Sequence, residues 1–289
     1  MPRSPSLIPV FILLLCVNPG RATTEAEAER LYQTRRYVEA QTAFEQLITA
    51  TPDNAGAAYH LGNLALMRNA PEEAAKWLEK ATVLAPRSSQ YFRSLGDAYG
   101  ISAQQKTGLF SRLGLARKCH AAYERAVALA PDDVDARYSL FTFFRQAPGI
   151  AGGGLDKARA QALEIQKRDE LRGALALIEL DVGEKRFEEA FAALDSIRRS
   201  HPEASVANYQ FGRAAAMSGK RLEEGVAALQ QYLSTPPDES QPPLWAARWR
   251  LGQIFVKQGD ISRARAEFAA GLQLNPTQPQ LVEAARDLK

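Results

Sequence analysis

Three pairs of adjacent glutamates are the side chains whose type and spacing come closest to acid–base chemistry: Glu72-Glu73, Glu188-Glu189 and Glu223-Glu224. Paired carboxylates can exchange protons with a substrate. Each pair, however, directly precedes a small residue in an amphipathic pattern, which places it in the first turn of an expected helix. Negative charge there interacts favourably with the helix dipole. We therefore predict that these pairs stabilise helices and do not catalyse a reaction.

The histidines and Cys119 give little indication of a metal or redox centre. Cys119 occupies a position where the helical pattern calls for a small buried residue, so we predict a thiol in the core. Lys118 and His120 on either side keep a reactive thiol open as an alternative. His60, His120 and His201 are far apart in the sequence and lack the spacing of metal ligands. We expect no metal site.

The run Gly152-Gly153-Gly154 precedes an expected helix, where successive backbone N–H groups can bind an anion. It lacks the Gly-Lys-Ser/Thr ending of a phosphate-binding loop, and the sequence contains no Gly-x-Ser-x-Gly nucleophile motif. Together with Pro148, the glycines predict an enlarged loop over 146–158. We expect no enzyme activity and no cofactor. The alternative function is a thiol- or ligand-dependent sensor or enzyme accessory that uses Cys119 or this loop.

The elements that must position these residues follow from a recurring spacing. A small residue is followed four positions later by a bulky residue and twelve positions later by proline. The six sets are Ala40/Phe44/Pro52, Ala74/Leu78/Pro86, Cys119/Tyr123/Pro131, Ala190/Leu194/Pro202, Gly225/Leu229/Pro237 and Ala264/Phe268/Pro276. A seventh set, Ala158/Ala162/Glu170, keeps the spacing without the bulky residue and the proline.

The stretch 55–86 illustrates what this spacing implies for structure. It reads as two short amphipathic helices joined by a tight turn. Gly62 in the first helix lets the second helix approach closely, and Leu78 fills the space beside it. Asn69 suits the left-handed conformation that ends a helix, and Pro71 suits the first turn of the next one.

This pattern resembles the tetratricopeptide repeat, a helix–turn–helix unit of about 34 residues. The resemblance implies an all-α fold, a right-handed superhelical solenoid of about seven repeats with a C-terminal capping helix. Repeat three exceeds the family period, so we expect both of its helices to lengthen over 101–118 and to meet in a turn near Gly108. The expected repeats are 23–52, 55–86, 89–131, 134–170, 171–202, 205–237 and 245–276, with the cap at 279–289.

Residues 1–22 have a different character from the rest of the chain. Arg3 precedes an apolar run at 7–17, and small residues at positions 20 and 22 resemble a cleavage site. This layout predicts a secretory signal peptide and hence a periplasmic or secreted protein, with an uncleaved N-terminal anchor as the alternative. The chain has 36 Lys and Arg against 33 Asp and Glu, and two of the arginines lie in the leader. The nearly neutral remainder gives no reason to expect a nucleic-acid partner.

The resemblance also implies a binding surface. In the family, the first helices line the concave face, and the fifth and ninth positions of each repeat point into it. The fifth-position row is Tyr59, Arg93, Tyr138, Leu175, Tyr209 and Trp249. The ninth-position row is Asn63, Asp97, Thr142, Glu179, Arg213 and Gln253. We expect the first row to face solvent, and we predict that all of these positions except Leu175 and Glu179 contact a partner, because Tyr, Trp and Arg dominate binding hot spots.

These features predict a non-enzymatic scaffold of the bacterial cell envelope that binds a peptide or partner helix of another protein in the concave groove. Members of the family can clamp the C-terminal carboxylate of a peptide with Lys and Asn side chains. Tyr59 and Arg93 stand where the clamp has lysine, and only Asn63 keeps the amide. An extended peptide with apolar or aromatic anchors is therefore favoured. The alternative docking surface is the long hairpin at 101–118.

Overall fold

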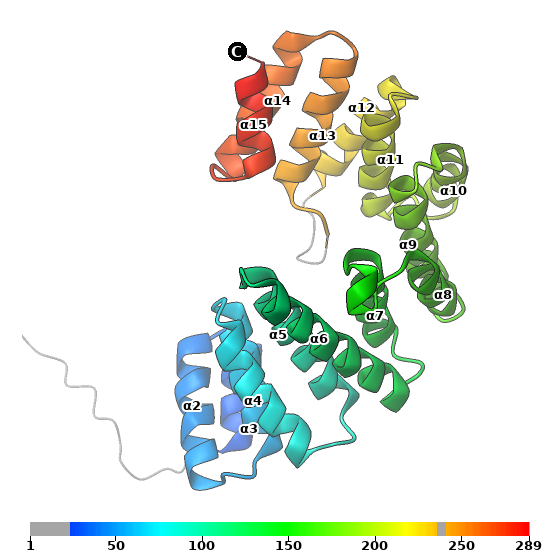
Figure 1. The fold of residues 1–289 in the computed structure, drawn as a ribbon. Coiled ribbons are helices and arrows are strands. Elements are labelled where there is room, and N and C mark those ends of the chain that lie inside the picture. The colour runs from blue at the N-terminus through cyan, green and yellow to red at the C-terminus, as the bar shows by residue number, and fades with distance from the viewer. Residues whose placement is uncertain (1–23, 236–240, 289) are drawn as a thin grey trace, which may run out of the picture. The chain divides into compact units, whose positions relative to one another are not determined.

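The chain folds into two compact units made of α-helices. The computed structural model describes residues 24–235 and 241–288, and the predicted signal peptide lies outside this range. The first unit falls within Met1–Pro86 and the second within Arg87–Lys289. The described residues contain fifteen α-helices, one 3-10 helix and no strand (Figure 1). The helices of the first unit are α1 (Glu25–Gln33), α2 (Tyr37–Ala50), α3 (Ala55–Met67) and α4 (Pro71–Leu84).

The second unit continues the same alternation of first and second helices. Among all the described helices, none has the length and the apolar character needed to cross a bilayer. The helices of this unit are α5 (Ser89–Gln105), α6 (Leu109–Leu129), α7 (Val134–Gln146), η1 (Gly149–Ala151), α8 (Leu155–Gln166), α9 (Glu170–Gly183), α10 (Phe187–Ser200), α11 (Ser205–Ser218), α12 (Leu222–Ser234), α13 (Leu244–Lys257), α14 (Ile261–Leu274) and α15 (Pro279–Asp287).

Local sequence signals set where the helices begin and turn. Asn54, Ser88 and Asp133 precede α3, α5 and α7, and each accepts hydrogen bonding from a backbone N–H of the first turn. In the turn between α3 and α4, Asn69 adopts the predicted left-handed conformation, with φ of 57°. Pro71 then begins α4, where its missing N–H would have had no partner inside the helix. The chain therefore folds into hairpins.

Several hairpins are closed by a bulky side chain that fills the space beside a glycine. Leu78 of α4 is fully buried, and a Cβ atom at Gly62 of α3 would stand 2.5 Å from its Cγ. A Cβ at Gly252 of α13 would stand 2.2 Å from Cε1 of Phe268 on α14. Further pairs of this kind are Gly96/Tyr123 and Gly212/Leu229. The bulky residue of the recurring pattern thus packs against the first-helix glycine within each of these hairpins, as the tetratricopeptide resemblance predicts.

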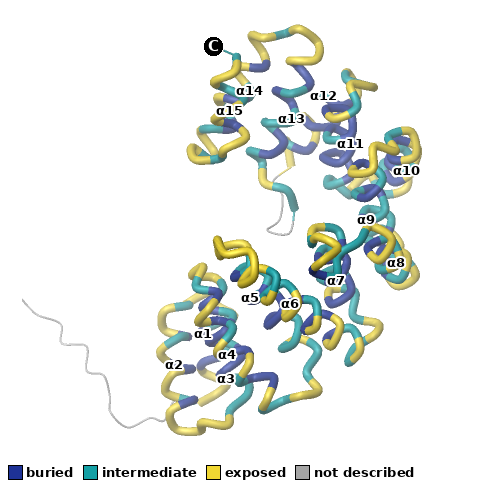
Figure 2. The backbone as a smooth tube through the Cα atoms, in the orientation of Figure 1, coloured by how far each residue is buried: buried dark blue, intermediate teal, exposed yellow. Residues whose placement is uncertain are grey.

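In the second unit the first helices line one side of the stack. Helix α5 contacts α7, α9 contacts α11, and α11 contacts α13, whereas α6, α8, α10 and α12 contact their own partner and the next first helix. Figure 2 shows that the buried backbone lies where these helices meet. The buried core includes Phe191, Phe211, Leu229 and Tyr232. We call the surface formed by α7, α9, α11 and α13 the first-helix face.

Repeats three and four depart from the regular period, and the enlarged loop of repeat four contacts the long hairpin of repeat three. Helices α5 and α6 have 17 and 21 residues, compared with 13 in α7 and 14 in α9. They meet in a turn at 106–108, as predicted. In the enlarged loop between α7 and α8, η1 packs on α6. There His120 of α6 stacks on Phe143, with ring centroids 4.9 Å apart, and Gly152 packs against His120. The loop thus supports the long hairpin.

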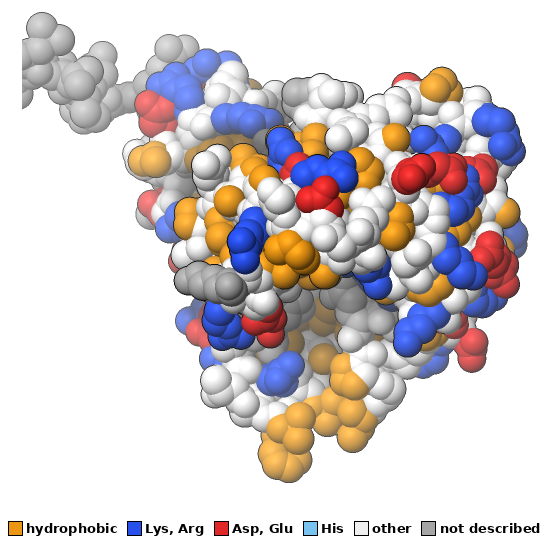
Figure 3. Space-filling model, turned by 90° about the horizontal axis from the view of Figure 1, so that it is seen from above, with side chains coloured by type: hydrophobic (Ala, Val, Ile, Leu, Met, Phe, Trp, Pro, Cys, Tyr) orange, Lys and Arg blue, Asp and Glu red, His pale blue; other side chains and the backbone are white. Residues whose placement is uncertain are grey.

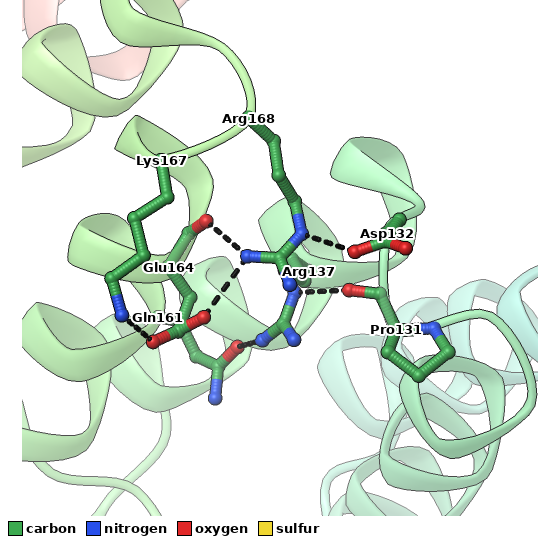
Figure 4. Close-up of polar contacts among 7 residues, drawn as sticks. All are labelled: Pro131, Asp132, Arg137, Gln161, Glu164, Lys167 and Arg168. Atoms are coloured by element: carbon green, nitrogen blue, oxygen red, sulfur yellow. Dashed lines mark hydrogen bonds and ion pairs between the residues drawn. The ribbon is translucent and has the colours of Figure 1, made fainter.

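A polar network ties α7 to α8 in repeat four, which lacks the bulky residue of the recurring pattern. Arg137 of α7 is 8% exposed. Its Nε donates to Pro131 O at 2.6 Å, and its Nη1 donates to Gln161 Oε1 at 3.1 Å (Figure 4). At the end of α8, Arg168 Nη1 donates to both the backbone and the carboxylate of Glu164, at 2.7 and 2.9 Å. Arg137 therefore has a structural role with its partners in place.

Large hydrophobic side chains also reach the surface. In the view of Figure 3, exposed hydrophobic side chains gather at the lower edge. Three of the most exposed large hydrophobic side chains among the described residues are Leu109, Phe110 and Ile150. Their exposed fractions are 73%, 88% and 71%. Leu109 and Phe110 lie at the tip of the long hairpin, and Ile150 lies in η1.

Candidate partner-binding site

The positions predicted to bind a partner are divided between the two units. Tyr59 and Asn63 lie on α3 of the first unit. The remaining positions lie on α5, α7, α11 and α13 of the second unit, and all of them except the buried Tyr209 are half-buried. They are Arg93, Asp97, Tyr138, Thr142, Tyr209, Arg213, Trp249 and Gln253. The second unit is therefore where several of these side chains come together.

The expectation that the aromatic row faces solvent is wrong for two of its members. Tyr59 and Tyr209 are each only 8% exposed. The ring of Tyr209 packs against Tyr232 of α12, with centroids 5.4 Å apart, and the ring of Tyr59 lies 5.1 Å from that of His60. A large ring at the edge of a helix gains more by folding onto apolar neighbours than by remaining in water.

Asp97 and Cys119 belong to a cluster inside the long hairpin. Tyr123 Oη donates to Asp97 Oδ1 at 2.7 Å. Burial raises the pKa of Asp97, while the hydrogen bond from Tyr123 and the charge of Arg93 act in the opposite direction. Cys119 is 3% exposed, and burial is the main cause that raises its pKa to about 12. A reactive thiol needs a partly exposed, electropositive setting, so the geometry gives no support to a thiol-based function.

The glycine loop after α7 has already used the backbone groups that could hold an anion. The N–H groups of Gly152, Gly153 and Gly154 donate to carbonyl oxygens of this loop and of α7, at 2.8 to 3.2 Å. An anion site at a helix start requires N–H groups that are still available. The glycines serve packing instead, because a Cβ at Gly153 would stand 1.8 Å from Ala147 O. The loop-based alternative therefore also lacks support.

On the first-helix face, Glu179 of α9 is the centre of a network that joins three helices. Tyr138 Oη of α7 donates to Glu179 Oε1 at 3.4 Å, and Gln210 Nε2 of α11 donates to the same oxygen at 3.5 Å. Arg145 Nε of α7 lies 3.6 Å from Glu179 Oε2. The guanidinium of Arg172 lies 4.7 Å from the centre of the Tyr138 ring. This carboxylate is thus shared by groups that surround it.

Beside this network, Arg213 of α11 and Arg250 of α13 form no ion pair with an acidic side chain of the described residues. Arg213 Nη1 donates to Gln210 Oε1 at 3.2 Å, and Arg250 Nη1 donates to Gln253 Oε1 at 2.9 Å. Both acceptors are neutral amides. The guanidinium of Arg250 lies 4.1 Å from the centre of the Trp249 ring. Its Nε is buried and has no hydrogen-bond partner within 24–235 and 241–288.

The two arginines are close enough to act on each other. Burial is the main cause that lowers the pKa of Arg250, the charge of Arg213 lowers it further, and Tyr209 raises it. Arginine nevertheless keeps its charge in proteins. The pair is therefore a partly buried positive site without an acidic partner among the described residues, which costs free energy in the unbound protein. A carboxylate or similar anion between α11 and α13 would offset this cost with charge-assisted hydrogen bonds.

The side chains that contact one another on the first-helix face lie only in part at fifth and ninth positions. The missed residues are Arg145, Arg172, Gln210 and Arg250. A charge signal could have found the last of these: Arg213 is the only charged residue of α11, and α13 contains basic residues without acidic ones. In α13, Arg248 pairs with Glu267 of α14 at 2.9 Å. The unmatched charge at this place therefore falls on Arg213 and Arg250.

The glutamate pairs and His60, which the sequence offered as candidates for catalysis or metal binding, occupy positions that stabilise the fold. The glutamate pairs lie in the first turns of α4, α10 and α12, as predicted. The imidazole of His60 stacks on Phe44 of the first unit, with centroids 4.6 Å apart. In the part of the chain that the structure describes, no group of three or more His, Cys, Asp and Glu side chains is arranged to hold a metal ion.

Comparison with known proteins identifies relatives of this architecture. A family model described as tetratricopeptide repeat matches residues 25–89 and 239–279. A tetratricopeptide repeat protein from Parabacteroides merdae has a similar structure, with a TM-score of 0.71 at 14% sequence identity over 91% of this chain and 96% of that chain. A search of curated proteins found no match.

Two longer chains contain a similar fold in about half of their length. Yeast Tom70 is similar with a TM-score of 0.63 at 13% identity, over 93% of this chain and 53% of that chain. The APC/C hetero-tetramer Cut9-Hcn1 is similar with a TM-score of 0.63 at 12% identity, over 91% of this chain and 48% of that chain. At these identities the shared feature is the fold.

Proposed function

Because this chain is a tetratricopeptide repeat protein, we propose that it is a non-enzymatic scaffold that holds an acidic segment of a protein partner on the first-helix face of its second unit. Proteins with such repeats are generally non-catalytic and bind other proteins. The observation that carries the proposal is the unmatched pair Arg213 and Arg250, half-buried beside Trp249. An uncompensated buried charge weakens a fold, and a ligand that supplies the opposite charge offsets this cost.

The side chains around the pair fit an extended peptide. A guanidinium can bind a carboxylate through two parallel N–H groups, which fixes its direction as well as its position. Trp249 and Tyr138 offer half-buried rings as apolar anchors at the two ends of the face. Gln253 offers an amide that can bond to a peptide backbone. The proposed ligand therefore combines an Asp or Glu side chain with an apolar neighbour.

The proposed place of action is the bacterial cell envelope. Its support is the signal-peptide pattern of residues 1–22. Fusing residues 1–23 to a reporter enzyme that is active only outside the cytoplasm tests this. We expect an active, cleaved fusion if the leader is removed, or an active, uncleaved fusion if it remains as an anchor. An inactive fusion would contradict export.

Selection of displayed random peptides on the full chain tests the partner chemistry. We expect the selected peptides to be rich in Asp and Glu next to an aromatic or aliphatic residue. The double variant Arg213→Gln/Arg250→Gln should bind them at least about tenfold more weakly, because one charge-assisted contact contributes that much or more. As a control, Lys76→Gln/Arg199→Gln removes two charges from second helices and should have no effect. Neutral or basic selected peptides, or an equal loss in the control, would refute the proposal.

A further inference from the structure

The hairpin of α5 and α6 ends in an exposed apolar tip. Leu109 and Phe110 are the first two residues of α6, and they are 73% and 88% exposed. Among the described residues, Phe110 is the most exposed of the large hydrophobic side chains. Neither side chain contributes to the core of the hairpin, which is formed further along α6 by Cys119, Ala122 and Tyr123. The stability of the fold therefore does not explain why these two apolar side chains are exposed, and such exposure is typical of an interaction site.

The sequence around the tip carries only positive charge. No acidic residue lies between Asp97 and Glu124, although acidic and basic residues are nearly balanced over the whole chain. Of the basic residues in this interval, Arg112 lies on the exposed first turn of α6. The basic residues are Lys106, Arg112, Arg117 and Lys118. An apolar tip whose flanking sequence carries only basic charges fits an anionic surface better than a neutral or basic one.

The structure also presents this tip beyond its neighbours. Seven more residues in α6 than in α9 or α10 correspond to about 10 Å of extra helix at 1.5 Å per residue. The enlarged loop of repeat four supports the hairpin, because η1 packs on α6 and His120 is stacked on Phe143. Ile150 of η1 is a further exposed apolar residue at the turn end of the next hairpin. The enlarged loop thus contacts α6 at His120, ten residues after Phe110.

We propose that the tip of the α5–α6 hairpin docks on an anionic lipid bilayer, with Leu109 and Phe110 in the interfacial region and Arg112 and Arg117 at the headgroups. Apolar side chains next to basic ones bind such membranes by combining burial with attraction to anionic lipid. A protein partner needs a complementary surface of about 800 Å² on each side. A narrow tip with two apolar side chains offers less than that, whereas a fluid lipid interface can accept it.

Vesicle flotation with the full chain tests this docking. We expect binding to vesicles of equal parts phosphatidylcholine and phosphatidylglycerol, weak binding to phosphatidylcholine alone, and loss of binding at high salt. Any vesicle binding by the apolar leader is the same in wild type and in every variant. The test is therefore the difference in flotation between wild type and each variant. Leu109→Ser/Phe110→Ser should reduce binding at least about tenfold, as the removal of two buried hydrophobic side chains requires. Val83→Ser, which removes an exposed apolar side chain of α4, should have no effect.

Phe110→Trp provides a direct reading of insertion. The fluorescence that this variant adds to that of wild type should shift to shorter wavelength with anionic vesicles and be quenched by lipids brominated on the acyl chain. Equal flotation of wild type and Leu109→Ser/Phe110→Ser, equal binding to neutral vesicles, or no quenching of the added tryptophan fluorescence would overturn the proposal. Protection of the tip by a protein and not by lipid would overturn it as well. Because α11 and α13 are unchanged, binding of the selected acidic peptides should persist in Leu109→Ser/Phe110→Ser, which separates this proposal from the proposed function.

Discussion

Two buried or half-buried arginines of the second unit differ in whether their guanidinium groups have partners within the fold. Arg137 is 8% exposed and donates to Pro131 O and Gln161 Oε1. Arg250 is half-buried, close to Arg213, and its Nε has no hydrogen-bond partner among the described residues. A buried charge with its partners in place supports the fold, whereas one without them weakens it until a ligand arrives.

Replacing each arginine by methionine should therefore have opposite effects on stability. Arg250→Met should raise the free energy of unfolding by about 1 kcal/mol, because a hydrophobic residue of similar length removes an uncompensated charge. It should also weaken binding of the selected acidic peptides. Arg137→Met should lower the free energy of unfolding by about 1–3 kcal/mol, because Pro131 O and Gln161 lose their donor. Urea titration followed by circular dichroism measures both. If Arg250→Met destabilises as much as Arg137→Met, Arg250 is a structural residue.

Cys119 should behave as an inert core thiol whose influence appears only in alkali. Burial raises its pKa from 9.0 to about 12. The folded state then holds the proton more tightly than the unfolded state. The corresponding stability is fully present below about pH 9 and is lost as pH rises towards about 12. Iodoacetamide should label Cys119 at pH 8 only after unfolding, and Cys119→Ala should unfold less readily in alkali than wild type. Rapid labelling of the folded chain would contradict this.

At the scale of elements, the hairpins depend on the fit between a first-helix glycine and a second-helix bulky residue. Gly252 and Phe268 illustrate it, since the Cβ position of the glycine is occupied by the ring. Such a contact joins residues that are close in sequence, so the spacing alone reveals it. The helix pairs, the long hairpin and the positions of the glutamate pairs were therefore predictable from the sequence, because each depends on neighbours within one repeat.

Matched glycine substitutions test this fit. Gly252→Ala should lower the free energy of unfolding by about 1–3 kcal/mol, because the added methyl group overlaps the buried Phe268 ring. Gly183 ends α9, and apart from the backbone of its own helix and its chain neighbours no atom lies within 4 Å of its Cβ position. Gly183→Ala should be neutral or raise stability by up to about 1 kcal/mol through helix propensity. Thermal unfolding of both variants provides the comparison, and a harmless Gly252→Ala would show that the hairpin does not rely on this contact.

The first-helix face was less predictable, because its details depend on contacts between helices that the register does not describe. The register placed Tyr209 towards solvent, yet Tyr232 of the adjacent helix α12 offers it an apolar surface. Arg250 lies outside the fifth and ninth positions, and its significance comes from Arg213 on another helix. The register placed Glu179 in the ninth-position row. Its hydrogen bonds and ion pair, however, involve side chains of α7 and α11 as well as its own helix α9. No spacing within one repeat encodes such neighbours.

At the scale of the molecule, a nearly neutral chain carries two local concentrations of positive charge with different surroundings. One lies half-buried between α11 and α13 next to Trp249, and the other surrounds the exposed tip of α5 and α6. The first suits a defined carboxylate, since buried guanidinium groups bind directionally. The second suits a diffuse anionic surface, since exposed charges act over a Debye length and depend on salt. A repeat solenoid can hold both because each site needs only neighbouring helices.

A photoreactive benzoylphenylalanine placed at Gln253 or at Gln231 measures most directly where a partner binds. Gln253 lies on α13 of the first-helix face, and Gln231 is exposed on α12, the second helix of the preceding hairpin. With a display-selected acidic peptide as the probe, we expect crosslinking from position 253, little from position 231, and loss of the 253 crosslink when Arg213→Gln is added. Equal or stronger crosslinking from position 231, or a 253 crosslink that is unaffected by Arg213→Gln, would contradict binding of an acidic segment on the first-helix face.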